Sequence, residues 1–231
     1  MLVKASLSCF TIFLILSKSD AMIFETNTVY HIYNQGNNHH KIFFAHGNYL
    51  YFLKKIHHHI LPFADVLAWC LMPNHFHLMI LVNKVEVNSE AVTLGDKLIN
   101  QPLTQSEGFT SGFTTTLNDS IGTMLRSYTR AINIQEERTG SLFRRKTKAE
   151  CITKVSSNQG FTSSETLIIK ETLISDREYL QTCFDYIHNN PMEAGLVKDA
   201  KDWEYSSYLE YCSLKNWKLI NKKTAEELGL H

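Results

Sequence analysis

The 231-residue chain is short of proline and glycine and carries no net charge. Its 4 prolines and 10 glycines exclude fibrous and largely low-complexity architectures. Its 23 basic and 23 acidic residues balance, so a nucleic-acid site would have to come from local clustering of charge. Hydrophobic residues make up 44% and aromatic residues 11% of the chain, which suffices for the core of one domain.

Paired cysteines and long hydrophobic runs are also missing. The five cysteines are widely spaced without a C-x-x-C pair, which favours reduced thiols in a cytoplasmic protein over a disulfide framework or a zinc ribbon. The apolar run 7–16 is too short to cross a bilayer comfortably, so we expect no membrane partner. Residues 1–21 have the layout of a short signal peptide, but Met22 offers an alternative start, and we favour this second interpretation.

Apolar periodicity predicts a mixed α+β fold. We expect strands at 28–33, around 42–44, at 64–71 and at 75–82, a strand beginning within 141–148, and helices at 48–61, at 120–137 and from Asp176 to Asn189-Asn190-Pro191. The order strand, helix, strand, strand, helix, strand matches a ferredoxin-like sandwich with a central antiparallel sheet. In that fold the helices cover one face of the sheet, and the other face is free to hold a site.

Two segments interrupt this pattern. Residues 84–118 are rich in Ser, Thr, Asn and Gly, and the string GFTS within them occurs again in the segment 153–175. We expect both segments to be flexible insertions into one domain that spans 22–212. Residues 213–231 are expected to form a C-terminal tail.

The triplet His75-Phe76-His77 is the most informative local pattern. On a strand, residues i and i+2 point to the same face, so the two imidazoles converge while Phe76 turns into the core. Two neutral imidazoles on a rigid strand make half of a divalent metal site. Alone, the pattern is more typical of a strand with two exposed histidines.

The surroundings of this triplet resemble a known family. The string MPNHFH at 72–77 is similar to the HUH nuclease motif in the form found in REP-associated tyrosine transposases and related insertion-sequence transposases. Three further stretches resemble that family in the expected order, namely YHIYNQG at 30–36, SYTRAIN with RTGSLF between 127 and 143, and YIHNNPMEAGLV with WEYSSY between 186 and 208.

The resemblance implies an enzyme that nicks and joins single-stranded DNA, at sites flanked by imperfect hairpins. It implies Tyr128 as the nucleophile, which forms a 5′-phosphotyrosine bond and releases a 3′-hydroxyl. His75 and His77 would bind a magnesium or manganese ion, which the absence of nearby thiolates favours over structural zinc. The enzyme would act as a monomer or as a homodimer with tyrosines acting in trans. Against this role, Tyr128 lies on the apolar face of its helix, which is typical of a core residue.

The third metal ligand has no clear candidate in the sequence. Relatives can supply a polar residue one turn after the tyrosine, but Ile132 occupies that position. Asn133 is adjacent and Gln135 is nearly two turns on, so water or DNA is left to complete the coordination of a magnesium ion.

Basic residues surround the predicted tyrosine helix and the segment after it. We expect these residues to contact DNA phosphates: Arg126, Arg130, Arg138, Arg144, Arg145, Lys146 and Lys148. Such a cluster is also typical of a solvated surface. At Gln35 the family often has an arginine, so a phosphate contact at this position is not expected.

Other interpretations stay open. A catalytically inactive relative that binds DNA or RNA would keep the same motifs, and a secreted protein with a ferredoxin-like core would explain residues 1–21. The run His57-His58-His59 is interpreted as structural, because consecutive helix positions point in different directions. The pair His39-His40 lies in an expected turn and is a weak metal candidate that we also interpret as structural.

Overall fold

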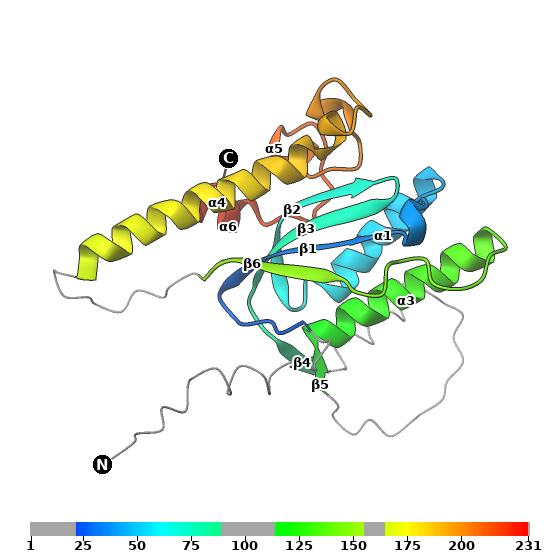
Figure 1. Ribbon diagram of the computed structural model, residues 1–231, viewed down its shortest axis with the longest axis horizontal. Coiled ribbons are helices and arrows are strands. Elements are labelled where there is room, and N and C mark those ends of the chain that lie inside the picture. Colours follow the sequence, from blue (N-terminus) through cyan, green and yellow to red (C-terminus); the bar gives the residue numbers. More distant parts are fainter. Residues whose placement is uncertain (1–21, 89–113, 155–164, 231) are drawn as a thin grey trace, which may run out of the picture.

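Four antiparallel strands form the central sheet of the computed structural model, which describes residues 22–88, 114–154 and 165–230 (Figure 1). The strands are β1 (Thr28–Gln35), β2 (Ala64–Met72), β3 (His75–Val82) and β6 (Lys148–Lys154). Their order in the sheet is β2-β3-β1-β6, with α1 (His46–His59) after β1 and α3 (Leu117–Gln135) after β3. This is the predicted α+β fold with ferredoxin-like topology.

A first hydrophobic core lies between the sheet and the two helices α1 and α3. Alternate residues of β3 enter it, Phe76 and Leu78 among them, together with Phe52 of α1 and Met124 of α3. Thr116 caps α3 by accepting a hydrogen bond from the backbone N–H of Asp119. The two helices of the predicted sandwich therefore share one face of the sheet, as expected.

The opposite face is not free, which corrects the prediction from the sequence. The long helix α4 (Glu165–Glu193) crosses it and forms a second core with the sheet, and Figure 1 shows it on the side away from α1 and α3. The apolar stripe of Leu180, Phe184 and Ile187 needed such a partner, because a helix with an apolar face must bury it. This helix also continues past Pro191 to Glu193, beyond the predicted stop.

The predicted short strand around 42–44 is wrong. Ile42 and Phe43 are buried in the first core, but both backbone N–H groups donate to the carbonyl of Pro73 in the β2–β3 turn. The backbone N–H groups of Phe44 and Ala45 donate to Oδ1 of Asn48, which lies in the first turn of α1. The segment is thus an irregular connection, preceded by the 3₁₀ helix η1 (Asn37–His39).

Both predicted insertions have described ends. The first begins and ends in a two-stranded ribbon of β4 (Glu86–Asn88) and β5 (Thr114–Thr116). The second runs from β6 into α4. Residues 89–113 and 155–164, with both GFTS strings, lie outside the described residues, as do residues 1–21.

The C-terminal segment covers the edge of the sheet at β2. It contains η2 (Ala200–Asp202), α5 (Tyr208–Tyr211) and α6 (Lys222–Glu227). Asn221 N donates to Val66 O at 2.9 Å, and Leu219, Ala225 and Leu230 are buried. Residues 213–230 therefore pack on the domain, in contrast to the predicted tail. No helix among the described residues is long and apolar enough to cross a membrane.

Candidate active site

The two histidines of β3 lie on the face of the sheet that α4 covers. Phe76 between them belongs to the first core, so strand alternation places His75 and His77 together on the other face. Their ring centroids are 5.0 Å apart and their planes cross at 89°. The two imidazoles share one face, as the alternation predicted.

Asn190, near the end of α4, brings its amide against both histidines. Its Oδ1 lies 3.2 Å from His75 Nε2, and its Nδ2 lies 3.3 Å from His77 Nε2. The Asn190 side chain is buried. Among the described residues no three His, Cys, Asp or Glu side chains converge as a metal site. The group assembled here combines two imidazoles with one amide.

Burial keeps the two imidazoles neutral. It lowers the pKa of His75, and it lowers the pKa of His77 well below the usual value, with smaller effects from neighbouring histidines. A neutral His75 has one ring proton but two acceptors, Asn74 Oδ1 at 2.6 Å and Asn190 Oδ1 at 3.2 Å. If the shorter contact takes the proton, the Nε2 lone pair faces an amide oxygen. A cation near these two atoms would satisfy both.

Tyr186 of α4 stands beside the histidines, one helical turn before Asn190. Its ring centroid lies 5.4 Å from that of His77, with the ring planes at 84°. The residue is 41% exposed, so a substrate can reach it. Because residues four apart share a helix face, α4 presents a tyrosine hydroxyl and an amide to the same site.

Tyr33 of β1 is a second tyrosine at this site. Its ring centroid lies 5.7 Å from that of His77. Its hydroxyl donates to Glu150 Oε1 at 2.5 Å, and burial together with Glu150 raises the pKa of Tyr33 to about 12. This phenol is therefore engaged with a carboxylate and is hard to ionise.

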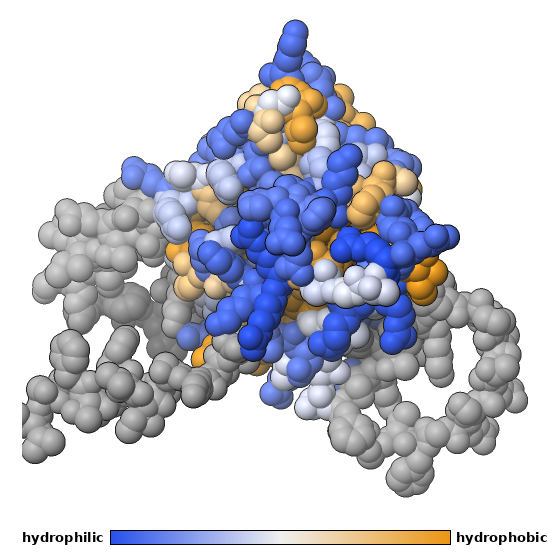
Figure 2. All heavy atoms as spheres, turned by 45° about the vertical axis from the view of Figure 1, so that its right-hand side comes forward, coloured by the Kyte–Doolittle hydropathy of each residue, from blue (hydrophilic) through white to orange (hydrophobic). Residues whose placement is uncertain are grey.

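The histidines open into a pocket of about 190 Å³ with a basic border. The residues lining this histidine pocket are Tyr33, Asn34, Gln35, His75, His77, Arg144, Lys146, Lys148 and Tyr186. Arg144 N donates to Gln35 O at 2.8 Å, and Asn34 Nδ2 donates to Thr147 Oγ1 at 2.9 Å, which holds the basic segment against β1. Figure 2 turns the end of the molecule that carries η1 forward and shows a mainly hydrophilic surface.

The remaining predicted DNA contacts are distributed elsewhere. Arg126 and Arg145 line a different pocket of about 320 Å³, which Lys146 also borders. Arg130 is exposed on α3, and Arg138 is half-buried just after that helix. The structure thus brings Arg144, Lys146 and Lys148 to the histidines and leaves the other four basic residues outside their pocket.

Tyr128, the nucleophile that the resemblance implies, lies away from the histidines of its own chain. Tyr128 lies in the first core, on the opposite face of the sheet, and is 0% exposed. Its hydroxyl donates to Ile42 O at 2.8 Å, and rings of Phe52 and Phe43 pack around it. Burial strongly raises the pKa of this phenol. Its place on the apolar face of α3 had indicated a core residue, and this is its position.

The sequence also carries a signal at Tyr186. A polar residue is expected one turn after the nucleophile, and Ile132 fails this requirement for Tyr128. Tyr186 meets it, because Asn190 follows four residues later in the string YIHNNP. Asn133 donates to Gly140 O, and Gln135 contacts Asn48, so both lie away from the histidines.

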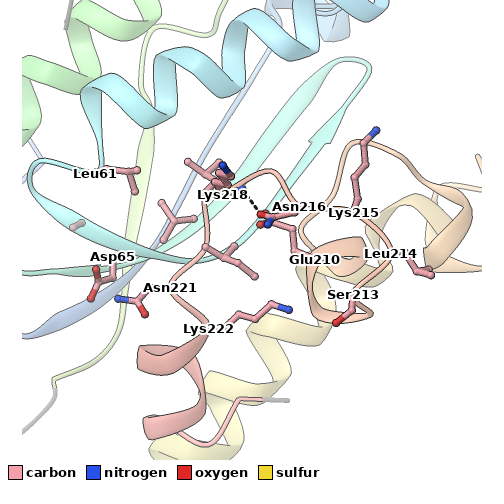
Figure 3. Close-up of a pocket in the computed structure, with 14 residues that line it drawn as sticks. Leu61, Asp65, Glu210, Ser213, Leu214, Lys215, Asn216, Lys218, Asn221 and Lys222 are labelled. Carbon is pink, nitrogen blue, oxygen red and sulfur yellow. Dashed lines mark hydrogen bonds between the residues drawn. The ribbon is translucent and has the colours of Figure 1, made fainter.

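A larger pocket, of about 910 Å³, lies beside the N-terminal end of β2, away from the histidines (Figure 3). Figure 3 shows Lys215, Lys218 and Lys222 around it. Its buried carboxylate, Glu210, interacts with the backbone of the surrounding loop at Leu219. None of the histidine-site residues lines it. This pocket has no counterpart to the converging imidazoles, amide and tyrosine, so we place the candidate active site at the histidines.

No protein-family model and no curated protein sequence matches the chain. Among solved structures, the chain is similar to one described as a REP-associated tyrosine transposase bound to a REP hairpin. That similarity has a TM-score of 0.44 and 13% identity, and it covers 81% of this chain and 80% of the other. A similarity of this size assigns no family, so the chemistry of the site is argued from its own residues.

Proposed function

We propose that the protein is a metal-dependent enzyme that nicks and joins single-stranded DNA through Tyr186. The observation that carries the proposal is the convergence of His75, His77 and Asn190 beside an accessible tyrosine. A basic pocket suited to phosphate adjoins these groups. In this proposal the nucleophile is Tyr186 in place of Tyr128, and Asn190 is the ligand that Ile132 could not be.

The donor set fits a divalent cation. Ligand atoms held at about 2.1 Å from one ion stand roughly 3.0–3.4 Å apart. The amide oxygen Oδ1 of Asn190 is the atom that would bind an ion, and it lies 3.2 Å from His75 Nε2, which is within this range. His75, His77 and Asn190 would hold the ion, with magnesium or manganese as the metal, because oxygen and imidazole donors suit them and no thiolate takes part. When bound, the ion polarises the scissile phosphate.

Tyr186 supplies the nucleophile. Its hydroxyl oxygen attacks the phosphorus, the bond from phosphorus to the 3′ oxygen breaks, and the phenolic proton is lost to water. The departing oxygen takes up a proton and becomes a free 3′-hydroxyl. The 5′ phosphate stays on Tyr186, so the energy of the phosphodiester bond is conserved and rejoining requires no ATP.

Arg144, Lys146 and Lys148 bind the DNA backbone on the way into the site. All three line the histidine pocket, and Lys148 Nζ lies 5.5 Å from the centre of the Tyr33 ring. Cations near the scissile phosphate compensate its charge and position the strand. Single-stranded DNA with hairpin flanks is the substrate class we propose.

The test is a covalent adduct. Purified protein is incubated with manganese and single strands carrying a label 3′ of the nick, because the tyrosine keeps the 5′ phosphate. Denaturing gels should show a labelled adduct with the unaltered protein and none with Tyr186→Phe. Two matched controls, Tyr128→Phe and Tyr33→Phe, each remove one hydroxyl and should keep the adduct.

An adduct that persists in Tyr186→Phe and disappears in Tyr33→Phe or Tyr128→Phe would place the nucleophile on that residue instead. DNA binding without any adduct in the unaltered protein, with several hairpin-flanked strands and both metals, would identify an inactive DNA-binding relative. Mass spectrometry of the trapped peptide identifies the modified residue directly.

A further inference from the structure

A third histidine, His31 of β1, lies directly beside His77 but outside the proposed ligand set. Its Nε2 is 2.9 Å from His77 Nδ1, the nitrogen on the far side of the ring from Asn190. The two rings are stacked at 22° with centroids 5.0 Å apart. His31 is 7% exposed, so this contact between imidazoles is buried.

The direction of this hydrogen bond follows from Asn190. The amide nitrogen Nδ2 can only donate, and it lies 3.3 Å from His77 Nε2. His77 Nε2 is then the acceptor, so the single proton of this ring is on Nδ1. It follows that His77 Nδ1–H donates to His31 Nε2, and that His31 carries its own proton on Nδ1.

His75 has an equivalent support on its other side. Its Nδ1 lies 2.6 Å from Asn74 Oδ1, an atom that can only accept. Each β3 histidine therefore directs Nε2 towards Asn190 while its Nδ1 is held by a neighbouring side chain. Hydrogen bonds of this kind fix the tautomer and the ring plane of metal-binding histidines.

We infer that His31 is a positioning residue, which fixes His77 as the Nδ1–H tautomer and aims its Nε2 at the metal. The inference rests on the proposed function, because it assigns His31 a role towards the ion that His75, His77 and Asn190 would hold. The β1–β3 pairing makes the contact rigid, since His31 stands next to Met79 in register and reaches back along the strand to His77.

Manganese binding, measured by calorimetry without DNA, tests this role. His31→Phe keeps a ring of similar size but has no acceptor, and it should weaken manganese binding about 10- to 100-fold. His31→Gln restores an acceptor near the position of Nε2 and should recover most of the affinity. His77→Ala, the reference for a lost ligand, should abolish binding.

The outcomes separate the inference from the proposed function. If the unaltered protein binds no manganese, the metal site and the role of His31 both fall. If His77→Ala abolishes binding while His31→Phe binds as tightly as the unaltered protein, the site stands and the inference is overturned. If His31→Gln is as weak as His31→Phe, an acceptor at this position does not account for the affinity, which also overturns the inference.

A second measurement needs no substitution and covers the case in which His31→Phe does not fold. Nitrogen-15 spectra of the unaltered protein with magnesium report which nitrogen of each imidazole carries the proton. The inference requires protons on Nδ1 of both His77 and His31. A proton on His31 Nε2 would reverse the hydrogen bond and overturn it.

Discussion

Two tyrosines on opposite faces of the sheet differ in how deeply they are buried. Tyr128 is fully buried, and its hydroxyl donates to a backbone carbonyl. Tyr186 is 41% exposed beside His77. Both belong to helices and both occur in motif-like strings, so the residue type alone does not distinguish them. Their position relative to the apolar stripe of the helix does.

The apolar stripe distinguishes them because a phenol on the stripe is buried in the core, whereas a reactive phenol must be accessible. Tyr128 aligns with Met124 and Ile132, so its ring enters the first core. Tyr186 is absent from the second core, which takes the neighbouring Ile187 and Cys183 instead. A tyrosine at the border of an apolar stripe, such as Tyr186, is held by its helix and stays accessible to solvent.

The largest expected effect concerns the histidines on the α4 face. His75→Ala and His77→Ala should each abolish cleavage and adduct formation in magnesium and in manganese, because each removes one of three donor groups. His57→Ala is the matched control, since His57 is exposed on α1 across the sheet and should keep full activity. Comparable nicking by either β3 variant would remove the metal hypothesis.

The next effect tests the stability side of the comparison. Tyr128→Ala should lower the free energy of unfolding by about 3–5 kcal/mol, since it empties a fully enclosed core position. Tyr186→Ala should lower it by less than about 1 kcal/mol, because that side chain is 41% exposed. Urea unfolding of both variants measures the difference. Equal losses of unfolding free energy would contradict the assignment of Tyr128 to the core and of Tyr186 to an accessible site.

The sequence predicts the fold better than the site, and the residues explain why. The strands around His75 and Tyr30 and the helix around Tyr128 follow from local periodicity, which needs no knowledge of the partner element. The position of α4 depends instead on a long connection from β6 and on which sheet face accepts Phe184. Without that placement, Asn190 looks like a helix stop, although it lies against both histidines.

Part of the candidate site can nevertheless be predicted from the sequence. The H-x-H spacing fixes the shared face of His75 and His77 by strand geometry alone. The contact of His31 with His77 requires the β1–β3 register, which one sequence does not give. The polar residue expected one turn after the tyrosine is missing at Ile132, whereas Asn190 stands in that position relative to Tyr186.

A smaller effect, on DNA binding, distinguishes the basic residues at the histidine pocket from those on α3. Replacing Arg144, Lys146 and Lys148 by Ala should weaken single-strand binding and reduce the slope of log K against log salt by about 2, at roughly 0.7 per lost phosphate contact. The double change of Arg126 and Arg130 to Ala should leave the slope nearly unchanged, because both lie outside the histidine pocket. Binding isotherms at several salt concentrations decide this, and a slope altered only by the double change would move the DNA path to α3.

The last effect is a pH dependence of stability that arises on the α4 face. Burial lowers the pKa of His188 to about 3, and burial, opposed by Glu150, lowers that of His31 to about 4. Below pH 6.5 these two histidines bind protons in the unfolded chain, whereas in the folded protein they stay neutral. Stability is therefore complete above this pH and falls as the pH drops toward 4, by at most about 1.4 kcal/mol per pH unit for each histidine.

Urea unfolding with a chelator present measures this slope. His188→Gln cannot take up a proton but can still donate to Ser207, which His188 contacts at 2.7 Å. The variant should lose less stability on acidification than the unaltered protein. An identical slope would show that His188 contributes nothing to the acid sensitivity of this face.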